Sequence, residues 1–284
     1  MGQLTQNVIQ SFSGIENPRH HYLMTTLVQK LHEYVQEVQL SQEEWEIAIG
    51  FLTETGQKCH EQRQEYILLS DVLGVSMLVD EINHHKHENQ TPSTVFGPFF
   101  IPDMPIRNYG APIFKELEQD QLPLLITGHV VDQDLQPIEH AKIEIWQTAL
   151  NGMYSGQDSH QDIDNLRGVF FSQAQGQYAI QTVLPVSYQI PSDGPVGDLL
   201  NFSKRHFWRP AHIHFMITAP DYHDLVTHLF IQDDEYLDSD TVFGVKAPLI
   251  VNYRRCEPSA EIEQKFNISS AYYQIEYQFV LVKE

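Results

Sequence analysis

The sequence predicts a protein of the α+β class, mainly β, in which a helical N-terminal unit precedes a β-sandwich. Three observations predict this fold. Apolar residues in the first part of the chain recur at spacings of three and four, the pattern of amphipathic helices. A segment rich in proline and glycine follows at residues 91–106. Beyond it, short runs of β-branched and aromatic residues alternate with a period of two.

The first two predicted helices have recognisable starts. One follows Pro18, a residue that suits a first helical turn. Its apolar stripe consists of Leu23, Leu27, Leu31, Tyr34, Val35 and Val38. The next begins at Ser41, whose hydroxyl can cap the helix while Glu44 reaches back to the Ser41 amide, and it ends before Gly56. Both segments are therefore expected to be amphipathic helices.

A third helix is expected to run from Ile67 to Ile82 without a break, with Gly74 inside it. Three helices in succession predict an α-helical unit. The proline- and glycine-rich segment cannot continue a helix and is expected to be an extended linker. We therefore expect two domains, a helical and linker domain at residues 1–98 and a β-sandwich domain at residues 99–284.

The rest of the chain predicts many short strands. The runs are LPLLITGHVVD, AKIEIWQ, GVFFSQ, QYAIQTV, HIHFMI, LVTHLFI and YYQIEYQFVLV. The last run alternates, so that one face carries Tyr273, Ile275, Tyr277, Phe279 and Leu281. Many short strands without helical periods between them indicate a β-sandwich or a barrel.

Composition argues against several classes of function. The chain has 17 basic and 38 acidic side chains, and its net charge of −21 repels phosphate backbones and so argues against nucleic-acid binding. No leader-like start and no run of roughly 20 apolar residues is present, so we expect neither secretion nor membrane insertion. Cys59 and Cys256 are too few for a disulfide framework, which favours a reducing cytoplasm.

Two histidines form the densest chemical signal. His212 and His214 lie two residues apart on a predicted strand, so their side chains project from one face and can bind one metal ion. The alternative is a pair of histidines on a solvent-exposed face. No glutamate stands at the spacing expected for a site completed by a carboxylate, so further ligands would have to come from elsewhere in the chain.

Two tyrosines stand in unusual turns near predicted strands. Tyr154 lies in NGMYSGQD and Tyr188 in PVSYQIPSDGP. Either one alone could be an ordinary tyrosine at the rim of a sheet. A phenolate becomes a good ligand beside a hard trivalent cation, because the cation offsets the loss of a proton whose pKa is about 10. Two tyrosinates with two neutral histidines would favour Fe(III).

These motifs together resemble a known family, the intradiol ring-cleavage dioxygenases of catechol catabolism. The motifs that carry the resemblance are GPFF at 97–100, NGMYS at 151–155, PVSYQIPSDGP at 185–195 and RPAHIHF at 209–215. Within the family, three segments look most like hydroxyquinol 1,2-dioxygenases, namely residues 63–82, 227–230 and 237–246. Ordinary catechol enzymes usually carry glutamine where His228 stands.

The resemblance implies roles for individual residues. It makes Tyr154, Tyr188, His212 and His214 the ligands of a non-haem Fe(III) ion. Tyr188 and Arg209 would be catalytic, Tyr188 by taking a proton from the substrate and Arg209 by stabilising the negative charge that develops. The substrate pocket would be lined by Leu68, Asp71, Val95, Phe96, Gly97, Pro98, Ile190, Pro191, His228 and Val242.

The implied reaction inserts both atoms of O₂ into hydroxyquinol, 1,2,4-trihydroxybenzene, and cleaves the ring between adjacent hydroxyls to 3-hydroxy-cis,cis-muconate or maleylacetate. The nearest alternative is the same chemistry on catechol or chlorocatechol. Alternatives of other classes are a non-catalytic β-sandwich that binds aromatics or lipids and a zinc hydrolase. The resemblance also implies a homodimer formed through the N-terminal helices, with a phospholipid in its interface.

Overall fold

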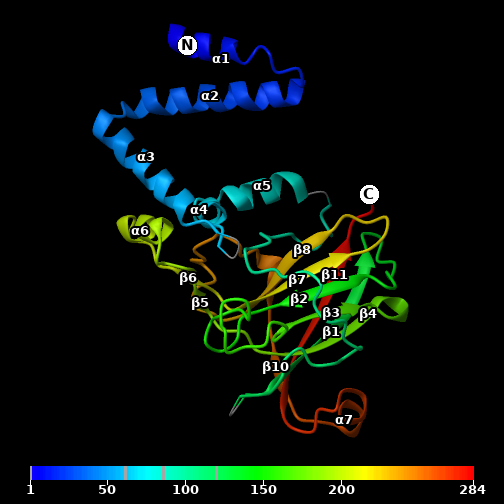
Figure 1. Cartoon of the computed structure of the whole chain (residues 1–284). Coiled ribbons are helices and arrows are strands. Elements are labelled where there is room, and N and C mark those ends of the chain that lie inside the picture. Colours follow the sequence, from blue (N-terminus) through cyan, green and yellow to red (C-terminus); the bar gives the residue numbers. More distant parts are fainter. Residues whose placement is uncertain (1, 61–62, 85–86, 119–120) are drawn as a thin grey trace. The chain divides into compact units, whose positions relative to one another are not determined.

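The computed structural model describes residues 2–60, 63–84, 87–118 and 121–284. The chain divides into two compact units, Met1–Gln57 and Lys58–Glu284. No described helix combines the length and the apolar character that crossing a bilayer requires. Figure 1 shows that the described helices of the smaller unit come first in the chain and that all strands belong to the larger unit.

The smaller unit consists of helices α1, α2 and α3, at Gln3–Ser11, Pro18–Val38 and Gln42–Gln57. The last two confirm the predicted helices, whereas α1 was not predicted. The predicted capping box is present, because the Ser41 amide donates to Glu44 Oε2 at 2.8 Å and the Glu44 amide donates to Ser41 Oγ at 3.2 Å. Helix α2 has no buried residue along its whole length, so its apolar stripe stays exposed.

The prediction of one continuous third helix was wrong. The segment forms two helices, α4 at Glu65–Val72 and α5 at Val75–His84. The helix is interrupted at Gly74. The φ of this residue is +72°, in the left-handed region that favours glycine and ends a helix. Both helices fall in the larger compact unit. The domain boundary expected after residue 98 stays a prediction.

Two large sheets form the β-sandwich of the larger unit (Figure 1). The four-stranded sheet has the order β10-β11-β1-β4, with bounds Arg254–Cys256, Tyr272–Leu281, Pro123–Asp132 and Gln177–Val183. The five-stranded sheet has the order β3-β2-β7-β8-β9, with bounds Arg167–Phe171, Lys142–Trp146, His212–Thr218, Leu225–Ile231 and Ile250–Val251. All seven strand-like runs singled out in the sequence are strands. A small sheet pairs β5, Tyr188–Gln189, with β6, Trp208–Arg209.

Short helical segments connect some of these strands. They are η1 at Ala174–Gly176, α6 at Pro195–Phe202, η2 at Ala247–Leu249 and α7 at Ala260–Phe266. Helices α6 and α7 were not predicted, since both are short and neither spans two full heptads of apolar spacing. The predicted linker at residues 91–106 contains no helix or strand, as expected from its prolines and glycines.

The main core lies between the two larger sheets, which confirms the β-sandwich. Ile213, Phe215 and Ile217 of β7 belong to one apolar cluster with residues of the opposite sheet, namely Leu124, Ile126, Ile180, Ile275, Phe279 and Leu281. Because side chains alternate along a strand, His212 and His214 project from the other face of β7. Both histidines therefore point away from the apolar interior, toward the loops on the outer face of the five-stranded sheet.

Candidate metal centre

The four predicted ligands come together on the outer face of the five-stranded sheet. All four are buried, with exposed fractions of 0% for Tyr154, 5% for Tyr188, 2% for His212 and 1% for His214. Tyr154 Oη lies 2.9 Å from His214 Nε2, and His212 Nε2 lies 3.3 Å from His214 Nε2. The Tyr188 ring centroid lies 5.7 Å from that of Tyr154 and 5.5 Å from that of His212. The loops therefore bring two phenols to two imidazoles.

Local sequence explains how the tyrosines reach the sheet. Tyr154 follows a tight turn at Gly152, whose φ is +75° and where a Cβ would lie 3.1 Å from the Tyr188 Cβ. Glycine thus allows the two tyrosine segments to approach closely. The Tyr188 backbone pairs with Arg209 in the small sheet, which holds both residues beside β7. Phe99 stacks on Tyr154 at 4.6 Å between centroids and so covers the outer side of its ring.

The hydrogen bonds of His212 show that its metal-binding nitrogen is free of a proton and faces the other predicted ligands. His212 Nδ1 lies 2.7 Å from the Pro210 carbonyl oxygen, and because a carbonyl only accepts, this nitrogen carries the proton. The lone pair of His212 is therefore on Nε2, which faces His214 Nε2 at 3.3 Å. A shared cation is a natural partner for converging nitrogen and oxygen lone pairs.

Burial keeps the imidazoles in the form that binds metals. Burial, with a further contribution from the charge of Arg209, lowers the pKa of His212 to about 3 and also places the pKa of His214 well below its usual value. Both rings are therefore neutral at pH 7. Burial raises the pKa of Tyr154 well above its usual value, and the proximity of Tyr188 adds to this. A nearby cation is needed before Tyr154 can act as a phenolate.

Arg167 is a cation beside Tyr154 that the sequence did not point to. Its side chain is 1% exposed, and its guanidinium carbon lies 5.7 Å from the centroid of the Tyr154 ring. Arg167 Nε donates to Ser155 Oγ at 2.7 Å. Burial lowers the pKa of Arg167 to about 10. Its charge favours the phenolate form of Tyr154.

Arg209 is held by an acid that the sequence reasoning missed. Arg209 Nε and Nη2 contact the two carboxylate oxygens of Asp240 at 3.1 and 3.2 Å, while Nη1 lies 3.2 Å from His212 Nε2. Burial opposes the charge on Arg209, but the charge and hydrogen bond of Asp240, together with the nearby Tyr188 and Tyr154, outweigh it and raise the pKa of the guanidinium. Asp240 also accepts from the backbone amides of Val242 and Gly244. The Arg209 guanidinium therefore stays charged, and its contacts with Asp240 fix its orientation.

A cavity of about 250 Å³ opens onto this centre. Tyr188 and Arg209 contribute to its wall. Most of the predicted substrate-pocket residues also line it, namely Leu68, Asp71, Val95, Gly97, Pro98, Ile190, Pro191 and Val242. Residues that were not predicted complete the wall, namely His60, Arg63, Gln64, Glu65, Phe99, Gly156 and Gln157. A larger hollow of about 790 Å³, lined partly by α5 and β11, contains none of the predicted ligands.

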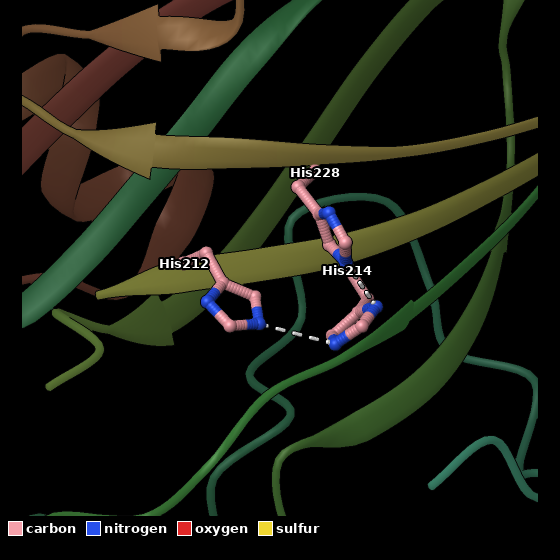
Figure 2. A group of neighbouring side chains, drawn as sticks. All are labelled: His212, His214 and His228. Atoms are coloured by element: carbon pink, nitrogen blue, oxygen red, sulfur yellow. Dashed lines mark hydrogen bonds between the residues drawn. The ribbon is translucent and has the colours of Figure 1, made fainter. Parts of the chain in front are cut away.

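Two predicted pocket residues, Phe96 and His228, are not among the described residues that line this cavity. Phe96 instead packs on Phe100 and Trp146, with ring centroids at 4.7 and 5.8 Å. His228 is completely buried on β8, and its Nε2 lies 2.7 Å from Nδ1 of His214 (Figure 2). The strand register pairs His228 of β8 with His214 of β7, so His228 contacts His214 at its Nδ1 side.

The three histidines His212, His214 and His228 form a compact group whose ligand atoms lie within 4.8 Å of one another. Within this group His214 uses different nitrogens for its two neighbours, Nε2 toward His212 and Tyr154 and Nδ1 toward His228. In Figure 2, His212 and His228 accordingly lie at different edges of the His214 ring. The geometry supports a metal centre on the Nε2 side, completed by tyrosine.

Comparison with known proteins agrees with this geometry. The family model described as "Dioxygenase" matches residues 95–282, and the one described as "Catechol dioxygenase N terminus" matches residues 17–91. The chain belongs to the intradiol ring-cleavage dioxygenases. The two matched segments meet near the linker, and the larger includes every described strand as well as the four predicted tyrosine and histidine ligands.

Individual members of the family resemble this intradiol dioxygenase over most of their length. Hydroxyquinol 1,2-dioxygenase of Rhizobium sp. (strain MTP-10005) is 42% identical, with 98% of this chain and 94% of the relative covered. 6-chlorohydroxyquinol 1,2-dioxygenase of Cupriavidus pinatubonensis is 44% identical, with 89% and 91% covered. The crystal structure of hydroxyquinol 1,2-dioxygenase from Pseudomonas putida DLL-E4 superposes with a TM-score of 0.91 at 50% identity, covering 99% of this chain and 98% of that one.

Proposed function

We propose that this intradiol dioxygenase uses Fe(III) and O₂ to cleave hydroxyquinol between adjacent hydroxyls, giving 3-hydroxy-cis,cis-muconate or maleylacetate. One observation carries the proposal: the side chains of Tyr154, Tyr188, His212 and His214 form one buried cluster. Through Tyr188 this cluster borders a cavity whose wall also includes Asp71. Relatives that share most of this chain's length are named for hydroxyquinol or its chlorinated form.

The donor set supports iron in the ferric state. Phenolate is a hard anionic ligand, and two phenolates with two neutral imidazoles suit a trivalent ion better than Zn²⁺, which prefers histidine, cysteine and carboxylate. When bound by these four residues, Fe(III) would supply Lewis-acid chemistry, drawing electron density from the substrate so that its ring can react with O₂. The alternatives of a zinc hydrolase and of a non-catalytic binding protein lack support from this donor set.

The protein's own side chains would perform the accompanying proton and charge chemistry. Tyr188 lines the cavity, so its phenolate oxygen can take a proton from a substrate hydroxyl. Arg209 also lines the cavity, and its positive charge would stabilise the negative charge that develops on the substrate. Apolar walls at Leu68, Ile190 and Val242 would hold the ring in place and exclude water.

Colour and oxygen labelling test this proposal. A ferric tyrosinate centre absorbs visible light, so the concentrated iron-loaded protein should be wine-red. Anaerobic addition of hydroxyquinol should shift the band, and admission of labelled O₂ should then place both labelled atoms in a ring-opened product. Faster cleavage of catechol or a chlorocatechol than of hydroxyquinol would favour the alternative assignment of the substrate. A colourless iron-loaded protein would contradict the proposed centre.

Asp71 is the residue that we propose selects the third hydroxyl of the substrate. It is 4% exposed and lies on α4 in the cavity wall. Burial raises the pKa of Asp71, an effect that the Ser76 hydroxyl and the charge of Arg209 oppose. A buried hydroxyl without a partner costs about 1–3 kcal/mol, so an acceptor in the wall distinguishes hydroxyquinol from catechol.

We predict that Asp71→Leu lowers kcat/KM for hydroxyquinol roughly tenfold or more while retaining or increasing the rate on catechol, because hydroxyquinol alone loses a hydrogen bond. Steady-state kinetics on both substrates measure the effect. Asp71→Asn is the matched control, since its amide oxygen keeps an acceptor at the same place. An equal fall on both substrates would assign Asp71 a purely structural role.

We also propose that the protein forms a homodimer through its N-terminal helices. The support is the apolar stripe of α2, where Leu23, Leu27 and Leu31 are 47%, 51% and 54% exposed. Exposed apolar surface of this extent marks an interaction site, and a second copy or a phospholipid would cover it. The small number of cysteines supports a cytoplasmic location, where thiols stay reduced.

Light scattering coupled to gel filtration should show a dimer for the wild type. Leu27→Glu should shift the protein toward the monomer, because a charge replaces an apolar contact. Gln36→Glu, an exposed polar position on the same helix, should leave the dimer intact. Mass spectrometry of an organic extract would reveal a phospholipid. A wild-type monomer without lipid would contradict this proposal.

A further inference from the structure

His228 is a buried polar residue that the proposed chemistry does not use directly. It is 0% exposed, and its position on β8 is directly opposite His214 on β7. Its ring packs edge-on against those of His214, His212 and Phe230, with centroid distances of 4.1, 4.7 and 5.4 Å. These neighbours fix the orientation of the ring, so its nitrogens point in defined directions (Figure 2).

The contact between His228 and His214 joins two nitrogens that can share only one proton. His228 Nε2 lies 2.7 Å from His214 Nδ1. If His214 offers the lone pair of Nε2 to a metal ion, its proton must be on Nδ1. His214 Nδ1 then donates, and His228 Nε2 is the acceptor. The remaining proton of neutral His228 is accordingly on its own Nδ1.

His228 Nδ1 is buried and has no hydrogen-bond partner among the described residues. A buried polar atom without a partner is destabilising, and an apolar side chain at this position would avoid it. Stability therefore does not explain why a histidine stands here. The explanation has to come from the other nitrogen, which meets a predicted metal ligand.

We infer that His228 is a positioning residue that holds His214 in the tautomer and ring orientation required for metal binding through Nε2. The inference rests on the proposed ligand role of His214. His212 obtains the same control from the backbone, because its Nδ1 donates to the Pro210 carbonyl. The two histidines are thus oriented by different groups, a carbonyl oxygen for His212 and a neighbouring imidazole for His214.

Metal affinity tests this inference without relying on turnover. We expect His228→Leu to bind Fe(III) roughly 10- to 100-fold more weakly than the wild type, because His214 Nδ1 loses its acceptor. His228→Gln should recover most of this affinity, since its amide oxygen can accept from the same nitrogen. Leu229→Val is the packing control, because it removes bulk from β8 next to His228 but on the face turned to the sandwich core, and it keeps the acceptor. Its affinity should stay close to that of the wild type.

Nitrogen NMR of histidine in the protein loaded with diamagnetic Ga(III) gives a second readout. The wild type and His228→Gln should show His214 protonated on Nδ1, whereas His228→Leu should show a mixture of tautomers or reduced loading. A leucine variant with wild-type affinity and an unmixed Nδ1–H signal would overturn the positioning role alone. A wild type that binds neither ion would contradict the proposed metal centre itself, so the two failures are distinguishable.

Discussion

Tyr154→Phe is expected to lower the affinity for iron by roughly 100-fold or more and to abolish most of the visible colour and activity. The substitution deletes one phenolate from a set of four protein ligands and leaves the aromatic ring in place. Tyr154 is completely buried, so water does not readily take the position of its oxygen. Iron content by atomic spectroscopy and the visible band should fall together in the purified variant.

A second tyrosine provides the control for this result. Tyr178 is 1% exposed, belongs to the core between the two sheets, and donates its hydroxyl to the Tyr277 carbonyl at 2.8 Å. Tyr178→Phe should lower stability by about 1 kcal/mol, because the hydrogen bond from its hydroxyl is lost, yet keep full iron content and colour. His212→Ala should behave like Tyr154→Phe. If Tyr154→Phe or His212→Ala kept full colour and activity, the substituted residue would not be a ligand of the metal.

Arg209→Lys is expected to keep iron and to reduce kcat by roughly 100-fold or more. Asp240 holds Arg209 through two parallel contacts, at Nε and Nη2, which directs the remaining Nη1 toward the metal centre. A lysine ammonium cannot make the paired contact and reach the centre at once, because its charge is at a single point. Rapid-mixing kinetics should show that the step after O₂ addition slows while substrate binding changes less.

Arg107→Lys is the matched control for this variant. Arg107 also pairs with an acid, contacting Asp164 at 2.8 Å, but it is partly exposed and takes no part in the cavity wall. The control should retain wild-type kinetics, because its half-buried ion pair lies outside the cavity wall and affects stability, not the reacting groups. Equal kcat values for Arg209→Lys and the wild type would take Arg209 out of the mechanism.

Much of the fold could be predicted from spacing alone. The period of two in HIHFMI put His212 and His214 on one face of a strand, and the capping pair Ser41 and Glu44 marked a helix start that the structure contains. Such local signals succeed because a side chain's direction follows from backbone geometry over a few residues. The same reasoning failed at Gly74, where a left-handed residue divides the segment into two helices. Apolar spacing continues across such a break and does not reveal it.

The sequence by itself determined the β-sandwich with its helical N-terminal unit and, through a resemblance of motifs, predicted Tyr154, Tyr188, His212 and His214 as ligands. Only the tertiary structure showed that Asp240 holds Arg209, 31 residues away in the chain, and that His228 meets the Nδ1 side of His214. These contacts depend on the register between β7 and β8 and on the loop after β8, which the packing of the whole sandwich decides. A local pattern specifies which way a side chain points, whereas its neighbour across the sheet follows from long-range packing.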